Sequence, residues 1–188
     1  MANKQAGFTL VELVVVIVVV GLLAVAALPR FLDVTDEAKK ASIEGVAGGY
    51  ATGVLSARAQ WEAQARPSQT IDGVTRNSID YDGVNFWLTS SDQSNGNFRD
   101  GYPYAVNRDN STFPSSLTNQ ACIDLMDNLL QNPPRVGTVE DAASNPDIRY
   151  SAQANDGDAT CTYTQKEGNS DHQFVYEIET GRVTVTLQ

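Results

Sequence analysis

The sequence predicts an α+β fold in which one long N-terminal helix packs against an antiparallel β-sheet head. The first observation is an apolar run, with residues 13–28 free of polar side chains, that is followed by residues of helical spacing. The second is the alternation of apolar and polar residues in several short segments near the C-terminus, which is typical of strands. Together they indicate one globular core with a hydrophobic N-terminal tail.

Charge divides the chain into a neutral part and an acidic part. Residues 1–66 carry six Lys and Arg against six Asp and Glu, whereas residues 67–188 carry seven against seventeen. Nucleic acids and anionic lipids are bound through clustered Lys and Arg, so the acidic part is a poor electrostatic match for either. We therefore expect no nucleic-acid partner.

The apolar segment, residues 8–28, is long enough to cross a membrane. As a helix its 21 residues extend about 31 Å, which matches a hydrocarbon core of ~30 Å. The alternative is a cleaved secretory signal, with Lys4 as its basic flank and residues 24–26 as the A-x-A cleavage site. Glu12 argues against that alternative, because a disposable signal has little reason to keep a carboxylate inside its apolar run.

The helical pattern resumes after Pro29, which removes a backbone donor and is expected to bend or loosen the helix locally. Apolar side chains then recur every three or four residues: Ile43, Ala47, Tyr50, Val54, Ala57, Trp61 and Ala65. Because Arg66 precedes a proline, which disfavours helical conformation, we expect one helix from Phe8 to Arg66.

The head, residues 67–188, is expected to begin with loops. Residues 67–118 are rich in Asp, Asn, Ser and Gly, with one or two short strands around residues 84–88 and 102–106. The aromatic residues of those strands are expected to be buried, the alternative being a sugar-binding aromatic surface: Phe86, Trp87, Tyr102 and Tyr104.

A helix and three strands are predicted in the rest of the head. Thr118 or Asn119 caps the helix, and the pair Pro133 and Pro134 stops it. The predicted strands are 160–164, 174–178 and 183–187, with a tight turn over 179–182.

Two cysteines, Cys122 and Cys161, follow the apolar segment. An even number of cysteines beyond a membrane span favours an oxidising compartment, although the Lys and Arg flanking the span would by themselves place the N-terminus outside. We give the cysteines more weight and expect a cytoplasmic N-terminus. A disulfide between them would close a loop of about 40 residues and stabilise the fold by roughly 4 kcal/mol.

The N-terminal third of the chain resembles the type IV pilins and their pseudopilin relatives. The likeness rests on a short leader that ends at Gly7, then Phe8, a glutamate four residues later, the apolar span and Pro29. The resemblance implies the pilin fold, cleavage after Gly7 by a prepilin peptidase on the cytoplasmic face, and methylation of the new amine at Phe8. It also implies that Glu12 meets the amine of a neighbouring subunit.

The physical argument for Glu12 agrees with that role. The amine of a cleaved Phe8 would be a cation drawn into the apolar core of a fibre, where an unpaired charge is costly. A pair within one helix is also compatible with the four-residue spacing. The alternative is an interfacial residue that reaches towards lipid headgroups.

The resemblance divides the chain into four parts with separate roles. They are a leader (1–7), a transmembrane and assembly half of the helix (8–28), an amphipathic half (29–66) and a globular head with a C-terminal disulfide loop (67–188). The expected protein sits in the inner membrane with a single span and then enters an extracellular fibre that serves surface attachment. Its partners would be the peptidase and other pilin subunits; the sequence identifies no surface receptor.

Within the family, the mannose-sensitive haemagglutinin pilins are the most similar. The residues that carry this likeness are 29–32, 40–45, 101–103 and 122–134. The stretch 43–67 favours an accessory subunit over a major one. Two alternatives remain: a pseudopilin of a type II secretion piston, and a membrane-anchored binding domain that never polymerises.

Catalysis is not expected. The single histidine, His172, lies in a polar run and is interpreted as a surface-loop residue, and neither a reactive cysteine nor a serine motif accompanies it. Residues 155–158 carry oxygen ligands at short spacing, but a solvated turn is the preferred interpretation over a calcium loop. We expect no cofactor and no metal.

Small residues recur every four positions in the amphipathic half of the helix: Ala41, Gly45, Gly49, Gly53 and Ala57. A glycine inside a helix costs roughly 1 kcal/mol relative to alanine, so three of them need a compensating contact. Residues four apart form one oblique ridge, which winds about 160° over this length. We expect the head to cover part of this small-residue ridge and a neighbouring subunit to cover the rest, the alternative being that the glycines merely loosen the helix.

Overall fold

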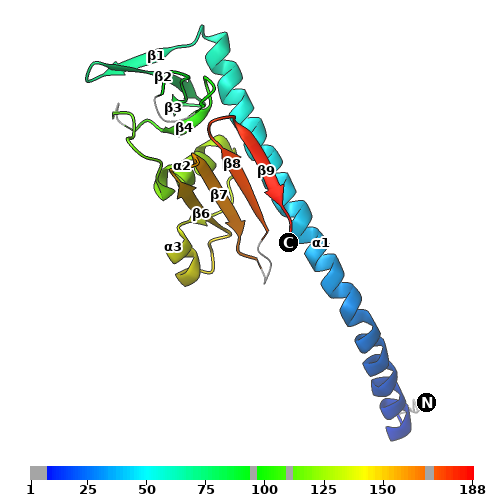
Figure 1. Cartoon of the computed structure of the whole chain (residues 1–188). Coiled ribbons are helices and arrows are strands. Elements are labelled where there is room, and N and C mark those ends of the chain that lie inside the picture. Colours follow the sequence, from blue (N-terminus) through cyan, green and yellow to red (C-terminus); the bar gives the residue numbers. More distant parts are fainter. Residues whose placement is uncertain (1–7, 94–96, 109–111, 168–171) are drawn as a thin grey trace, which may run out of the picture. The chain divides into compact units, whose positions relative to one another are not determined.

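The structure is a computed structural model of the whole chain, and it describes residues 8–93, 97–108, 112–167 and 172–188. It divides into two compact units, Met1–Ala41 and Ser42–Gln188. We call the second the globular unit. The helix α1 (Leu10–Ala63) contributes its first part to one unit and its last part to the other (Figure 1).

The C-terminal end of α1 differs from the prediction by three residues. The helix ends at Ala63, because Ala65 and Arg66 adopt left-handed backbone conformations with φ of 61° and 60°. The backbone N–H of Arg66 donates to the carbonyl of Trp61 at 2.9 Å, a bond that closes the last turn. The predicted extension to Arg66 was therefore wrong, and Ala65 is exposed instead of buried.

The first sheet of the globular unit lies directly after α1 in the chain. Its order is β1-β2-β3-β4, all antiparallel: β1 (Ser68–Ile71), β2 (Val74–Tyr81), β3 (Val84–Leu88) and β4 (Pro103–Val106). The strands expected near 84–88 and 102–106 are confirmed, but two strands were missed. Asp72-Gly73 and Asp82-Gly83 form the turns on either side of β2, each with positive φ at both residues, as tight hairpins require.

The second sheet has the order β5-β6-β7-β8-β9. Its members are β5 (Val136–Gly137), β6 (Tyr150–Asn155), β7 (Thr160–Gln165), β8 (Gln173–Glu177) and β9 (Arg182–Thr186). The short β5 pairs parallel to β6, and the other pairs are antiparallel. The three predicted C-terminal strands are confirmed, whereas β5 and β6 were not predicted.

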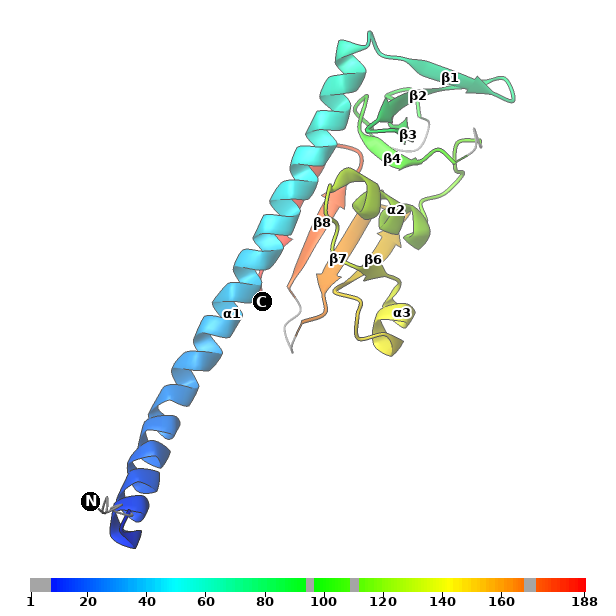
Figure 2. The same ribbon diagram turned by 180° about the vertical axis from the view of Figure 1, so that it is seen from behind.

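Two short helices complete the described part of the globular unit. In α2 (Asn119–Leu129) the Thr118 hydroxyl accepts the N–H of Ala121 at 3.1 Å, so the predicted cap is confirmed. In α3 (Val139–Ser144), Thr138 and Asp141 form a reciprocal capping box. Since α2 contacts both β4 and β6, it joins the two sheets (Figure 2).

The core of the globular unit forms between α1 and the second sheet. The predicted apolar stripe of the helix is buried from Ile43 to Trp61: Ile43, Ala47, Tyr50, Val54, Ala57 and Trp61. The Tyr50 ring lies 5.3 to 5.6 Å from those of Tyr163, Phe174 and Tyr176. Burial of each large side chain contributes roughly 1.5–3 kcal/mol, so this contact fixes the sheet on the helix.

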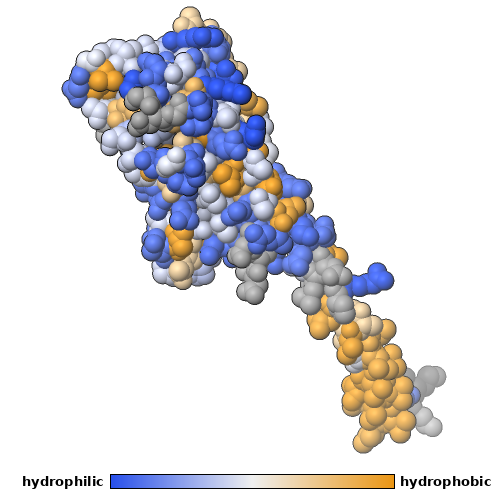
Figure 3. Space-filling model, viewed as in Figure 1, coloured by the Kyte–Doolittle hydropathy of each residue, from blue (hydrophilic) through white to orange (hydrophobic). Residues whose placement is uncertain are grey.

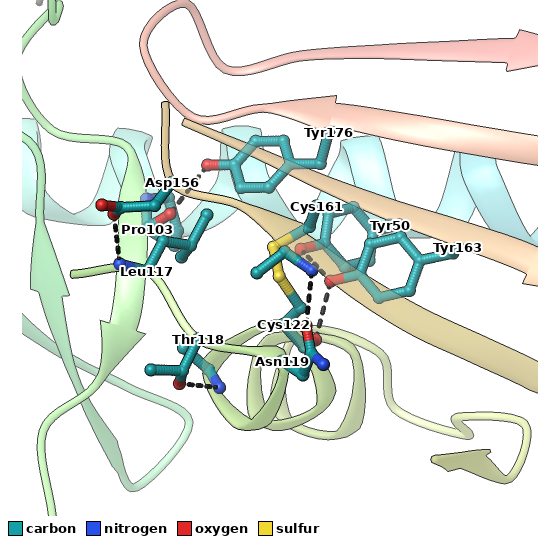
Figure 4. Close-up of a disulfide and its surroundings, with 12 residues drawn as sticks. Tyr50, Pro103, Leu117, Thr118, Asn119, Cys122, Asp156, Cys161, Tyr163 and Tyr176 are labelled. Carbon is teal, nitrogen blue, oxygen red and sulfur yellow. Dashed lines mark hydrogen bonds between the residues drawn. A yellow bond between two sulfur atoms is a disulfide. The ribbon is translucent and has the colours of Figure 1, made fainter. Parts of the chain in front are cut away.

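A disulfide between Cys122 of α2 and Cys161 of β7 confirms the predicted bridge (Figure 4). The Tyr163 hydroxyl donates to the Cys122 carbonyl at 2.7 Å, and the Tyr50 hydroxyl lies 3.1 Å from that of Tyr163. Because Tyr163 gives its one hydroxyl proton to Cys122, Tyr50 is the donor between the two tyrosines. The bridge and these bonds tie α2, the second sheet and α1 together.

Candidate functional site

The predicted processing and assembly residues lie at the start of α1. Gly7 falls outside the described residues, and Phe8, the first described residue, is 93% exposed. The Glu12 carboxylate accepts the backbone N–H and the hydroxyl of Thr9, each at 2.8 Å. In return the Thr9 hydroxyl accepts the N–H of Glu12 at 3.2 Å.

This reciprocal arrangement is a capping box, which satisfies two backbone donors at the helix start. In the uncleaved chain the nitrogen of Phe8 is a peptide nitrogen, so Glu12 has no amine of its own to pair with. The carboxylate instead holds the first turn of its own helix. Sequence analysis did not predict this capping role, although the Thr-x-x-Glu spacing from Thr9 to Glu12 is the usual signature of a capping box.

The apolar segment that follows is exposed on every side. Leu10–Leu28 has the length and composition of a membrane span, a mean hydropathy of 3.0 and no buried residue. Figure 3 shows its apolar side chains gathered at the surface. A helix that is apolar all round needs lipid or other apolar helices around it. The helix runs on through Pro29 without interruption.

The small-residue ridge is covered at one end and open at the other. A side chain at Gly53 would collide with the backbone of Leu129, and one at Gly49 would come within 3.1 Å of Leu130 Cδ2. Nothing lies within 4 Å of the position that a side chain would take at Gly45. The end of α2 thus packs on Gly53, and the Leu130 side chain just beyond it approaches Gly49.

His172 is buried, so its interpretation as a surface-loop residue was wrong. Only 1% of it is exposed, because it shares the inner face of the second sheet with Phe174 and Tyr176, two and four positions later. Its Nδ1 accepts the backbone N–H of Gln188 at 3.0 Å. The imidazole therefore anchors the C-terminus within the globular unit.

The Asp-rich turn after β6 serves as a structural connection. One Asp156 carboxylate oxygen accepts the backbone N–H of Leu117 at 2.6 Å (Figure 4). The Asn155 amide donates to Asp158 at 2.7 Å. Among the residues that the structure describes, no group of three or more His, Cys, Asp or Glu is placed to hold a metal ion.

The aromatic residues in and beside β3 and β4 are buried, as expected. Phe86, Trp87, Tyr102 and Tyr104 are each exposed by 6% or less. They therefore form no exposed aromatic surface, and the predicted burial is confirmed.

Comparison with known proteins finds a family match at the start of the chain. Residues 2–28 match the family model described as the prokaryotic N-terminal methylation motif. The chain is 41% identical over 91 residues to the type IV narrow pilus major component PilA5 of Thermus thermophilus. That match covers 48% of this chain and 75% of the relative.

Two further relatives carry fimbrial names. The chain is 33% identical over 100 residues to the fimbrial protein EcpC of Eikenella corrodens, covering 49% of this chain and 65% of the relative. It is 37% identical over 73 residues to a fimbrial protein of Moraxella nonliquefaciens, covering 38% and 47%. The chain thus spans less than two thirds of these two relatives. No solved structure matches it.

Proposed function

This chain belongs to the type IV pilin family, and we propose that it is a non-enzymatic structural subunit of a pilus used for surface attachment. The observation that carries the proposal is a helical segment that is apolar and exposed on all sides, with one carboxylate at its start. Such a segment is stable in a bilayer before assembly and among identical segments afterwards. The relatives' names, which are those of pilus and fimbrial proteins, support the same conclusion.

Processing at the bond between Gly7 and Phe8 is the first step of the proposal. Residues 1–7 are a leader that a prepilin peptidase removes on the cytoplasmic side of the inner membrane, with methylation of the new amine. Residues 8–28 then form the membrane and assembly half of the helix. The match to a methylation motif over residues 2–28 supports this step.

Glu12 has two successive partners in this account. Before cleavage its carboxylate caps the helix through Thr9. After cleavage the amine of a neighbouring subunit's Phe8 is a cation, and in an apolar fibre it becomes the stronger partner. A pair between subunits also sets the axial register, because a slipped helix leaves two charges unpaired.

The open end of the small-residue ridge is proposed as a seam between subunits. Gly45 has no neighbour within 4 Å, so another helix backbone has room to approach there. Replacement of Gly45 by Leu should leave the subunit folded and yet keep it out of fibres. Entry into fibres at the parent level would remove Gly45 from the interface. Pro29, which lies between the two halves of the helix, is proposed to let it bend during packing.

We further propose an accessory place in a pilus of the mannose-sensitive haemagglutinin type, on the sequence likeness of residues 29–32, 40–45, 101–103 and 122–134. The share of this chain in sheared fibres tests this place, because an accessory subunit makes up a small part of a fibre and a major subunit makes up most of it. Quantitative mass spectrometry of sheared fibres should find this chain well below the most abundant subunit. If it is the most abundant subunit, the chain is the major one.

The structural role itself is tested by shearing fibres from cells and identifying their subunits by mass spectrometry. We expect this chain in the sheared fraction, with its disulfide formed. A chain that stays in the membrane fraction while fibres are shed would contradict the proposal and favour an anchored domain that does not polymerise.

A further inference from the structure

A pocket of about 400 Å³ opens within the globular unit, beside the first sheet. Its aromatic walls are Trp87 of β3, Tyr104 of β4 and Phe113, and its polar lining includes Arg76, Asp72 and Asp156. We call it the aromatic pocket. The Phe113 ring lies 6.0 Å from that of Trp87 and 4.8 Å from that of Tyr104. The volume falls in the range of small-molecule sites, roughly 300–1,000 Å³.

Two hydrogen-bond donors on the residues that line this pocket have no partner. Trp87 is 1% exposed, and its indole Nε1–H finds no acceptor in the described part of the chain. The same holds for the buried Nε–H of Arg76. A buried donor without an acceptor carries its full desolvation penalty, so native proteins rarely leave two together without a purpose.

One side chain, Phe113, borders both unpartnered donors. Its ring packs edge-on against Trp87, and the Arg76 guanidinium carbon lies 5.4 Å from its centroid. Phe113 is half-buried and belongs to a stretch without helix or strand. Because this ring borders both buried groups, a ligand oxygen can reach the two N–H groups only if the ring turns aside.

The remaining polar groups set the chemistry of the occupant. Asp72 sits in the turn between β1 and β2, and Asp156 accepts the Leu117 N–H through one carboxylate oxygen, which leaves the other for a ligand. Burial, with the nearby Asp156 carboxylate, raises the pKa of Tyr104 to about 12, so its hydroxyl stays protonated. Two carboxylates disfavour an anionic ligand, and the Arg76 guanidinium disfavours a cation.

We propose that the aromatic pocket binds a neutral pyranose sugar. A hydroxyl both donates and accepts, so a ring of hydroxyls satisfies the Trp87 and Arg76 donors and the Asp72 and Asp156 carboxylates together. The apolar C–H face of the ring packs against Phe113, the half-buried ring among the aromatic walls. This site does not depend on how subunits assemble, because all its residues lie within one globular unit.

The test uses the indole N–H signals of the full-length chain. The protein has two tryptophans, so selective ¹⁵N labelling of the indole gives two signals. Trp61 is an internal control, because its Nε1–H already donates to the Pro67 carbonyl at 2.9 Å. The chain is kept in lauryldimethylamine oxide, a detergent without a sugar headgroup, and titrated with methyl β-D-galactopyranoside and methyl α-D-glucopyranoside.

At least one glycoside should shift the Trp87 signal in a saturable way and leave the Trp61 signal in place. A Trp87 signal that does not shift with either glycoside would overturn the proposal. Equal shifts of the Trp87 and Trp61 signals would overturn it as well. Tighter binding of sodium glucuronate than of its neutral counterpart would overturn it too. A Trp87 signal that responds to fibre assembly but to neither sugar would assign the pocket to a second copy of the chain.

Variants separate recognition from folding. Replacement of Arg76 by Lys keeps the charge and removes the Nε–H, and should weaken glycoside binding about tenfold. Asp72→Asn should also weaken binding, whereas Asp82→Asn should not. The two aspartates occupy equivalent Asp-Gly turns with φ of 52° and 53°, and only Asp72 lines the pocket. Equal affinities for the two variants would remove Asp72 from the site.

Discussion

Replacing Gly53 by Ala is expected to destabilise the globular unit, whereas the same substitution at Gly45 is expected to stabilise it. Both glycines lie in α1, so the gain in helix propensity is the same, roughly 1 kcal/mol. They differ in what the new methyl group meets. At Gly45 nothing lies within 4 Å.

At Gly53 the methyl group would overlap the carbonyl oxygen of Leu129 and lie 3.2 Å from its carbonyl carbon and Cβ. That neighbour is helix backbone and cannot rotate away, so the end of α2 must move. Overpacking of a core typically costs about 1–3 kcal/mol, which outweighs the propensity gain. At Gly49 the obstacle is the tip of the Leu130 side chain at 3.1 Å, which can change rotamer, so we expect a change near zero.

Thermal unfolding of the three full-length variants in micelles, followed by near-UV circular dichroism, measures this order. For a chain of this size 1 kcal/mol shifts Tm by about 2–4 °C. The Gly45 variant should therefore melt about 2–4 °C above the parent and the Gly53 variant below it. Equal shifts for all three would refute the reasoning, because propensity alone would then explain them and α2 would not press on the helix.

Three further predictions concern charge, the disulfide and tyrosine ionisation. Glu12→Gln keeps a capping side chain and removes the charge, so it should block entry into fibres, whereas Thr9→Ala should not. The yield of each variant in sheared fibres measures this difference. Normal assembly of the Gln variant would leave the cap as the only role of Glu12. Joint replacement of Cys122 and Cys161 by Ser should cost roughly 4 kcal/mol, measured by chemical unfolding, and an unchanged midpoint would contradict the stapling role. Burial raises the pKa of Tyr104 to about 12. The contribution of the protonated Tyr104 to stability is therefore complete below pH ~10 and is lost as the pH rises towards 12. An ultraviolet titration in which every tyrosine ionises near pH ~10 would contradict this.

The elements that the sequence predicts well are those with a clear period. The stripe from Ile43 to Trp61 and the strands β7, β8 and β9 follow helical and alternating patterns, and packing reinforces each pattern. The helix end was harder to place, because it depends on left-handed conformations at Ala65 and Arg66 that their side chains do not favour.

The missed strands divide into two cases. The hairpins around β2 carry two Asp-Gly pairs, which are strong turn signals, so a closer examination of residues 67–88 would have found them. The strand β6 has the sequence YSAQAN, which contains no β-branched residue and only one aromatic residue, Tyr150. It is a strand because β5 and β7 pair with it on either side, and that is information from distant residues.

The functional residues also divide into those that a local sequence signal predicts and those that only the fold brings together. Thr9 and Glu12 are three residues apart, so their cap could be predicted locally. His172 was wrongly predicted to lie in a surface loop, because its polar neighbours were given more weight than its two-residue spacing from Phe174, which puts both side chains on one face of a strand. The aromatic pocket could not be predicted, because it joins Arg76, Trp87 and Asp156, which only the fold brings together.

The intact mass of the subunit from purified fibres tests the central claim most directly. The account predicts a chain that begins at Phe8, carries one added methyl group and lacks two hydrogens because Cys122 and Cys161 are joined. Loss of the leader creates the amine that Glu12 pairs with, so processing and assembly depend on the same cleavage. A fibre subunit whose mass still includes residues 1–7 would contradict the account.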